Sequence, residues 1–180
     1  MPDPARIIVV TGVQAAGKTT VGRLLAERLD RAAFIEADDL QRMIVAGREW
    51  VGEAGPPQGE AAAQLRLRLH NACLLARSFY AAGFSAVLDD IVIGERFDHL
   101  RAELQGLPFH LVVLAPDVAT VKSRDAARGK HVGEEWADYL DAELRRTMTG
   151  VGMWVDSAGQ AVEETVEEIL RRFPECLIES

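Results

Sequence analysis

The chain has 180 residues, 48% of them hydrophobic and 27% charged, which is the composition of one ordinary globular domain rather than of a disordered segment. Its 20 Lys and Arg against 28 Asp and Glu give a formal net charge of −8, which argues against a surface that neutralises nucleic-acid phosphates. The apolar run at 7–10 is far shorter than a membrane span, so we expect a single soluble, cytoplasmic domain over residues 1–180, with neither nucleic acid nor membrane as partner.

Short apolar runs alternate with segments of helical spacing along the whole chain. A β-branched run that ends at Gly12 is typical of a strand buried on both faces of a parallel sheet. We expect strands at 6–11, 32–36, 84–88, 108–115 and 153–155 and helices at 18–30, 39–47, 60–82, 95–104, 117–127, 134–148 and 160–172. This order predicts an α/β fold with a five-stranded parallel sheet flanked by helices, whose binding sites lie at the carboxyl ends of the strands.

The first strand-to-helix connection carries a phosphate-binding pattern. Residues 12–19 read GVQAAGKT and match G-x-x-x-x-G-K-[ST], in which backbone N–H groups wrap an anion, the lysine neutralises phosphates and the threonine holds Mg²⁺. The chain has 17 arginines but only three lysines, so a lysine at the required position is not readily accidental. The alternative is an ordinary glycine-rich turn. The residues expected to contact ATP or GTP are Gly12, Val13, Gln14, Ala15, Ala16, Gly17, Lys18, Thr19 and Thr20.

Two pairs of aspartates follow predicted strands. Asp38 and Asp39 come after the second strand, and Asp89 and Asp90 after the third, so both pairs should emerge at the edge that holds the phosphate loop. We interpret Asp39 as the cap of a short helix and Asp38 as the proton acceptor and a substrate contact. Asp89 and Asp90 are candidates for the metal and the acceptor, and the sequence leaves open which of the two faces the metal. We assign Asp89 as the ligand that joins Thr19 on Mg²⁺; the alternative is a solvated loop start.

A basic segment interrupts the acidic chain. Residues 122–131 (KSRDAARGKH) carry a local charge of +3, and Arg124 and Arg128 are four residues apart, a spacing that is mildly unfavourable unless an anion lies between them. We therefore predict that 123–135 is a helical lid that closes on nucleotide phosphates, with both arginines in binding and catalysis. The alternative is a solvated helix face in which Lys122 pairs with Asp125.

Together these segments resemble the small P-loop kinases of the chloramphenicol phosphotransferase-like group, which are similar to shikimate, gluconate and nucleoside monophosphate kinases. The resemblance covers most of the chain and rests on GVQAAGKT at 12–19, EADDL at 36–40, AVLDDIVIG at 86–94, SRDAARGK at 123–130 and WVDSAG at 154–159. It implies that Asp38 is the catalytic base, that Arg124 and Arg128 are lid arginines, and that Ser157 and Ala158 contact the nucleotide base. The sequence departs from the family at Gln14 and at 47–59, within the acceptor-site loop at about 41–60.

The resemblance implies transfer of the γ-phosphoryl group of ATP or GTP, with Mg²⁺, to a hydroxyl of a small molecule. The acceptor in a self-resistance kinase of this group is an antibiotic; the alternatives are a metabolic kinase for a sugar acid, shikimate or a nucleotide, and a regulatory ATPase. A GTPase switch is excluded because its N-K-x-D element needs an asparagine that the single Asn71 does not provide. The sequence does not determine the oligomeric state, and a homo-oligomer is one of the alternatives.

Overall fold

A parallel sheet in the order β2-β3-β1-β4-β5 runs through the protein, with a short sixth strand, β6, paired to β4. The computed structural model describes residues 4–127 and 134–179. The strands are β1 (Ile7–Gly12), β2 (Ala32–Glu36), β3 (Ser85–Asp89), β4 (Phe109–Leu114), β5 (Met153–Val155) and β6 (Leu177–Ile178). The helices are α1 (Lys18–Glu27), α2 (Ala37–Arg42), α3 (Gly59–Ala81), α4 (Glu95–Glu103), α5 (Val118–Ala127), α6 (Glu134–Met148) and α7 (Val162–Arg171), and η1 (Phe173–Cys176) is a 3₁₀ turn.

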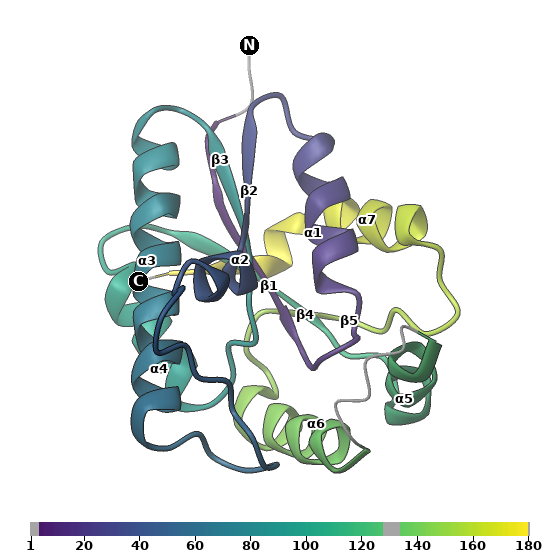
Figure 1. The fold of residues 1–180 in the computed structure, drawn as a ribbon. Coiled ribbons are helices and arrows are strands. Elements are labelled where there is room, and N and C mark those ends of the chain that lie inside the picture. The colour runs from purple at the N-terminus through teal and green to yellow at the C-terminus, as the bar shows by residue number, and fades with distance from the viewer. Residues whose placement is uncertain (1–3, 128–133, 180) are drawn as a thin grey trace.

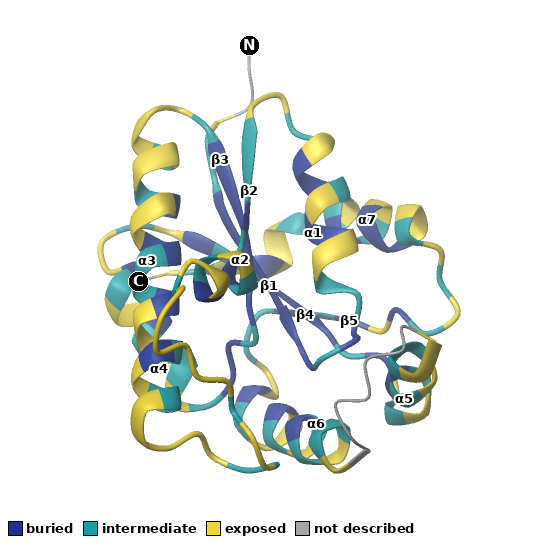
Figure 2. Cartoon of the chain, in the orientation of Figure 1, coloured by how far each residue is buried: buried dark blue, intermediate teal, exposed yellow. Residues whose placement is uncertain are grey.

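Helices cover both faces of this sheet. Figure 1 shows α3 and α4 on one face and α1 and α7 on the other, with α5 and α6 beyond the carboxyl ends of the strands. The central strand β1 is therefore wholly buried, as its unbroken β-branched run predicts, and so are β3 and nearly all of β4 (Figure 2). None of the helices in the described part of the chain has the length and apolar composition needed to cross a bilayer.

The predicted α/β architecture is confirmed, with two differences. β6 pairs antiparallel with the first residues of β4, at Phe109 and His110, because β5 is short and covers only the later residues of that edge. The helix after β2 begins at Ala37 rather than at Asp39 and ends at Arg42, so the prediction that Asp39 caps it was wrong. Strand β2 passes directly into this helix, and Asp39 lies in its first turn, where a carboxylate is favoured by the helix dipole.

The carboxyl ends of the strands form the edge that matters for function. Glu36 and Asp89 are paired in register at the ends of β2 and β3, and Val10 of β1 is in register with Asp89. The loop of residues 43–58, which we call the acceptor loop, runs from α2 past the same edge toward α6 before α3 begins (Figure 1). The sheet thus brings together the connections that carry the predicted site residues.

The turn into β5 gives a test of the fold. Gly150 and Gly152 both have a positive φ, of +82° and +67°, but a Cβ at Gly152 would lie 2.7 Å from the Leu111 carbonyl oxygen, whereas Gly150 faces open space. Gly150→Ala should cost about 1 kcal/mol from backbone strain, and Gly152→Ala about 1–3 kcal/mol more because β4 must shift. Equilibrium denaturant unfolding measures the loss of stability in each variant. Equal losses would contradict the close packing of Gly152 against β4.

Candidate active site

The loop between β1 and α1 has the backbone of an anion-binding turn. Gly12, Ala15 and Gly17 all have positive φ, and a Cβ at Gly12 would collide with the Leu114 carbonyl oxygen, so glycine is required there. Gly17 occupies the N-cap of α1, so no side chain satisfies the first N–H groups of that helix. The start of α1 is therefore available to an anion such as a phosphate.

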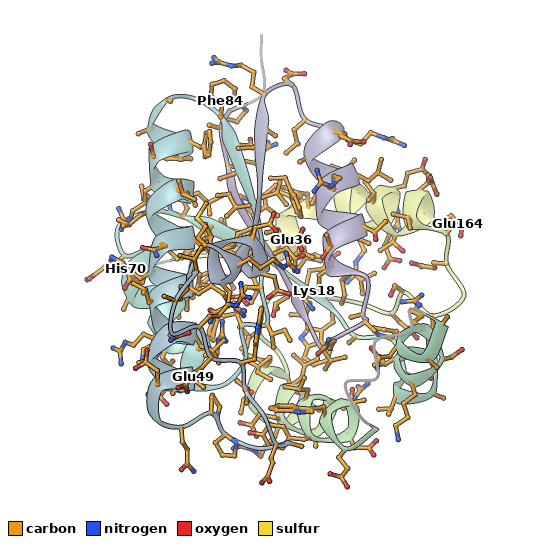
Figure 3. All side chains as sticks on the ribbon, in the orientation of Figure 1. Lys18, Glu36, Glu49, His70, Phe84 and Glu164 are labelled. Carbon is orange, nitrogen blue, oxygen red and sulfur yellow. The ribbon has the colours of Figure 1, made fainter. Side chains whose placement is uncertain are left out.

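Lys18 is the first residue of α1 and lies in the central region of the molecule (Figure 3). Its Nζ donates a 3.0 Å hydrogen bond to the Val13 carbonyl oxygen, which folds the side chain back over the loop. Burial lowers the pKa of Lys18, while the nearby carboxylates of Asp89, Asp90 and Asp38 oppose that shift. A bound polyphosphate would add negative charge and so favour the charged ammonium further.

Thr19 and Asp89 join the loop to β3. The Thr19 hydroxyl donates a 2.6 Å hydrogen bond to Asp89 Oδ2. Burial raises the pKa of Asp89, against the opposing effects of Lys18 and of this hydrogen bond. The pair offers two hard oxygen ligands of the kind Mg²⁺ prefers. Within residues 4–127 and 134–179 no group of three His, Cys, Asp or Glu could hold a metal alone, so phosphate oxygens or water would supply the remaining ligands.

Glu36 is a carboxylate that the sequence reasoning missed. It is the last residue of β2, in register with Asp89, and it lies in the central region of the molecule that also holds Lys18 (Figure 3). Burial raises the pKa of Glu36, and the charges of Asp39 and Asp89 raise it further. The sequence contained a signal for this residue. Glu36 ends the apolar run of β2 just as Asp89 ends that of β3. Glu36 therefore adds a second carboxylate beside Asp89, at the ends of two neighbouring strands.

Asp38 and Asp90 share an arginine, Arg68, that the sequence reasoning also missed. Arg68 of α3 donates from Nη1 to Asp38 Oδ1 at 2.9 Å and from Nη2 to Asp90 Oδ1. Arg96 of α4 donates to the second oxygen of Asp90 at 2.6 Å. Asp90 is thus a buried partner of two guanidinium groups, whereas Asp89 is the aspartate that contacts the phosphate loop. The Nε atoms of both arginines are buried and have no hydrogen-bond partner among the described residues.

Arg124 is held in place on the opposite side of the phosphate loop. Its Nη1 donates to the Ala16 carbonyl oxygen at 3.2 Å and to Ser157 Oγ at 3.3 Å, and its Nη2 donates to the Ser157 carbonyl oxygen at 2.8 Å. Arg124 therefore binds acceptors on both the phosphate loop and the segment that follows β5. Lys122 forms a 3.0 Å salt bridge with Asp138 of α6. Arg128 and the middle of the predicted lid lie outside the described residues.

A cavity lies beside Arg124, between α5 and the loop that follows β5. Its volume is ≈ 700 Å³. It is lined by Asp117, Ala119, Thr120, Ser123, Arg124, Gly159, Gln160 and Ala161. Ser157 borders this region through its bonds to Arg124, and Ala158 donates its backbone N–H to Asp156 at 2.9 Å. The segment that the resemblance assigns to the nucleotide base therefore adjoins a cavity next to the phosphate loop.

The acceptor loop is anchored at both its base and its tip. Gln64 of α3 accepts from the Glu49 N–H at 2.8 Å and donates to the Gly47 carbonyl oxygen at 2.7 Å, and the Gln41 side chain donates to Gln64 at 3.0 Å. Trp136 of α6 donates to the Gly52 carbonyl oxygen at 3.1 Å. The loop exposes the large apolar side chains of Met43 and Val45 before these anchors and of Trp50 between them.

Comparison with known proteins places this chain in a family. A family model described as an AAA domain matches residues 7–152. A tunicamycin resistance protein from Deinococcus radiodurans is 25% identical, with 98% of this chain and 99% of that one covered and a TM-score of 0.67. Comparison with curated proteins finds no match.

Two kinases of known structure share the fold. A gluconokinase from Sinorhizobium meliloti 1021 is 24% identical over 95% of this chain and 92% of its own, with a TM-score of 0.64. A shikimate kinase from Acinetobacter baumannii, solved with shikimate, is 20% identical over 94% and 93%, with a TM-score of 0.67. The fold is thus that of small-molecule P-loop kinases.

Replacement by asparagine should change the stability of the protein in opposite directions at Asp89 and at Asp90. Because the pKa of Asp89 is raised, the folded protein loses stability as the pH rises through that pKa, and Asp89→Asn should remove this loss and raise the melting temperature of the nucleotide-free protein at neutral pH. The gain should shrink as the pH falls below the ordinary aspartate range. Asp90→Asn should instead cost about 3–5 kcal/mol, because two buried guanidinium groups lose their shared counter-charge.

Thermal melts of both variants between pH 4 and pH 8 in magnesium-free buffer measure the contrast. Asp89→Asn should also weaken the magnesium dependence of nucleotide binding. If Asp89→Asn destabilised the protein as much as Asp90→Asn, the assignment of different environments to the two carboxylates would be wrong.

Proposed function

This chain belongs to the AAA domain family, and on that premise we propose that it is a phosphotransferase that moves the γ-phosphoryl group of ATP or GTP to a hydroxyl of a small molecule. The observation that supports this most directly is the gathering of Lys18, Thr19, Asp89 and Asp38 at one sheet edge, around the open N-terminus of α1. Within the family, the motifs at 12–19, 86–94 and 123–130 favour the chloramphenicol phosphotransferase-like group. Such a kinase would act in the cytoplasm, where its nucleotide is made.

The donor half of the mechanism follows from the phosphate loop. Backbone N–H groups of 12–20 would hold the phosphates, and Lys18 would neutralise charge on the β- and γ-phosphates as the bond breaks. Thr19 and Asp89, with Glu36 behind them, would hold Mg²⁺, which supplies charge neutralisation on the phosphate oxygens when bound. The cavity beside Arg124 would take the nucleoside, with Ser157 and Ala158 at its border, and Arg128 would complete the lid.

The acceptor half rests on Asp38. The acceptor hydroxyl oxygen forms a bond to the γ-phosphorus while the bond to the β–γ bridging oxygen breaks, and ADP or GDP leaves with that electron pair. Asp38 takes the hydroxyl proton. Its side chain is half exposed, in contrast to the buried Asp90, and this exposure fits a group that must meet a substrate.

We propose an antibiotic as the acceptor, inactivated by O-phosphorylation. Two observations support an uncharged acceptor with an apolar part. Arg68 and Arg96 are already paired with Asp38 and Asp90, so they add no net positive charge that would favour an acidic acceptor. The acceptor loop presents Met43, Val45 and Trp50 to solvent. The similarity to a tunicamycin resistance protein at 25% identity over 98% of the chain points the same way.

The acceptor is tested in two steps. Expression in a sensitive bacterial host, challenged with chemically diverse antibiotics, should raise resistance to one class, and mass spectrometry should find a single added phosphate on that compound. A parallel assay of ADP release should compare neutral hydroxylated compounds with gluconate, shikimate and nucleosides. Turnover of an acid alone would favour the metabolic alternative, and slow hydrolysis unaffected by every compound would favour a regulatory ATPase.

Lys18→Ala tests the donor site. The variant should fold, because among the described residues the Lys18 side chain makes one hydrogen bond, to the Val13 carbonyl. Phosphoryl transfer should nevertheless fall by about 10²–10³-fold, because a preorganised positive charge is lost from the transition state. Circular dichroism and steady-state ADP release measure the two effects. A folded variant with near-normal kcat would rule out the proposed phosphotransferase.

Asp38 and Asp39 form a matched pair for the acceptor site. Asp38→Asn keeps the size of the side chain but cannot take a proton, so kcat should fall by about 10²–10⁴-fold. Asp39→Asn should remain within a few-fold of wild type, because Asp39 makes an exposed ion pair with Arg42 and such pairs contribute little. Nucleotide affinity and melting temperature serve as controls. An inactive Asp39→Asn beside an active Asp38→Asn would reverse the assignment.

A further inference from the structure

Helices α2 and α3 meet along a polar seam with two contacts. Asp38 and Gln41 are three residues apart on α2, and Gln64 and Arg68 are four residues apart on α3, so each pair lies on one helix face. The Gln41 amide donates to Gln64 at 3.0 Å, and Arg68 donates to Asp38 at 2.9 Å. The first contact anchors the acceptor loop through Gln64, and the second reaches the carboxylate assigned to proton transfer.

Arg68 is the fixed member of the second contact. Its side chain is 6% exposed, whereas that of Asp38 is 50% exposed. Its other Nη atom is bound to Asp90, whose carboxylate is 1% exposed and is held from its second oxygen by Arg96. A guanidinium group presents its N–H donors in a rigid planar fork, so fixing one arm on Asp90 also fixes the direction of the arm that meets Asp38.

We propose that Arg68 is a positioning residue for the phosphoryl-transfer reaction, which orients the carboxylate of Asp38 toward the acceptor hydroxyl through its anchorage on Asp90. The inference rests on the proposed function, in which Asp38 takes the proton. Arg68 itself contacts neither the nucleotide nor the reacting oxygen. Its bond goes to Asp38 Oδ1, and none of the described residues donates to Oδ2, so one oxygen is held by the protein and the other can meet the substrate.

This arrangement answers a physical problem at the site. Asp38 sits on a helix of six residues and is half exposed, so its side chain would otherwise be free to sample several rotamers. Proton transfer requires the acceptor atom within hydrogen-bond distance of the hydroxyl, and small misplacements lower rates steeply. A rigid partner anchored in the core removes that freedom, whereas an exposed lysine in its place could not.

The test uses water as the acceptor, so that it does not wait for the natural substrate. In the hydrolysis of Mg·ATP, the water oxygen bonds to the γ-phosphorus, the bond to the β–γ bridging oxygen breaks, ADP leaves with the electron pair, and Asp38 takes a water proton. Single-turnover hydrolysis of radiolabelled ATP would be measured for wild type, Arg68→Lys, Asp38→Asn and the double variant, with nucleotide affinity measured in parallel. Arg68→Lys keeps the positive charge beside Asp90 but lacks the two-armed geometry.

We expect Arg68→Lys to slow hydrolysis by about tenfold or more without changing nucleotide affinity, and the double variant to match Asp38→Asn alone. Such non-additivity shows that Arg68 acts through Asp38, since a general weakening of the fold would multiply the two losses. Arg77→Lys is the matched control. Arg77 lies on the same helix and ties α3 to the carbonyl oxygens of Glu103 and Gln105, away from Asp38, so its replacement should leave the rate unchanged.

Several results would overturn the inference. These are a wild-type rate in Arg68→Lys, losses that multiply in the double variant, an equal loss in Arg77→Lys, or a wild-type rate in Asp38→Asn, which would leave Arg68 no carboxylate to act through. If Arg68→Lys did not fold, Arg68→Met, which leaves Asp90 paired with Arg96, would carry the same cycle. Lys18→Ala separates the two levels of the argument: hydrolysis that survives it contradicts the proposed function, whereas hydrolysis that needs Lys18 while the other losses multiply contradicts only the role of Arg68.

Discussion

The carboxylate of Asp90 lies out of solvent just beyond the end of β3, where a charge is tolerated only because two guanidinium groups share it. Arg68 comes from α3 and Arg96 from α4, so this one buried charge joins two helices to the sheet. The same guanidinium group of Arg68 continues to Asp38 on α2. The position of Asp38 in the proposed acceptor site therefore depends on the ion pair between Arg68 and Asp90, although neither of these two residues takes part in the proposed proton transfer.

Adjacent residues near the end of a strand point to opposite faces of a sheet, so Asp89 and Asp90 contact different partners. Asp89 meets Thr19 at the start of α1, on one face, whereas Asp90 meets arginines of α3 and α4, on the other. The proposed donor and acceptor halves thus lie on different faces of one strand. Two consecutive aspartates are enough to connect both halves to β3, and exchanging their roles would require the strand to shift by one residue.

The parts of the site that follow from local pattern could be predicted from the sequence, and the parts that depend on helix packing could not. The phosphate loop and its strand are local. The contact of Thr19 with Asp89 joins residues 70 positions apart, but it follows from the rule that parallel strands end at one edge of a sheet. Arg68 was invisible because it sits in a long helix whose rotation about its axis is set by packing. Asp39 was misjudged because the cap position depends on where β2 ends, and helix boundaries are not fixed by the residue type alone.

The anchoring of the acceptor loop has a consequence for how this fold diversifies. Gln64 holds the backbone of residues 47 and 49 through main-chain atoms, and Trp136 holds Gly52 in the same way, so neither contact reads the side chains of the loop. Side chains such as Met43, Val45 and Trp50 can therefore be replaced without loss of those anchors. A loop with constant backbone attachment and freely variable side chains would let the proposed phosphotransferase change its alcohol substrate while its phosphate site stayed the same.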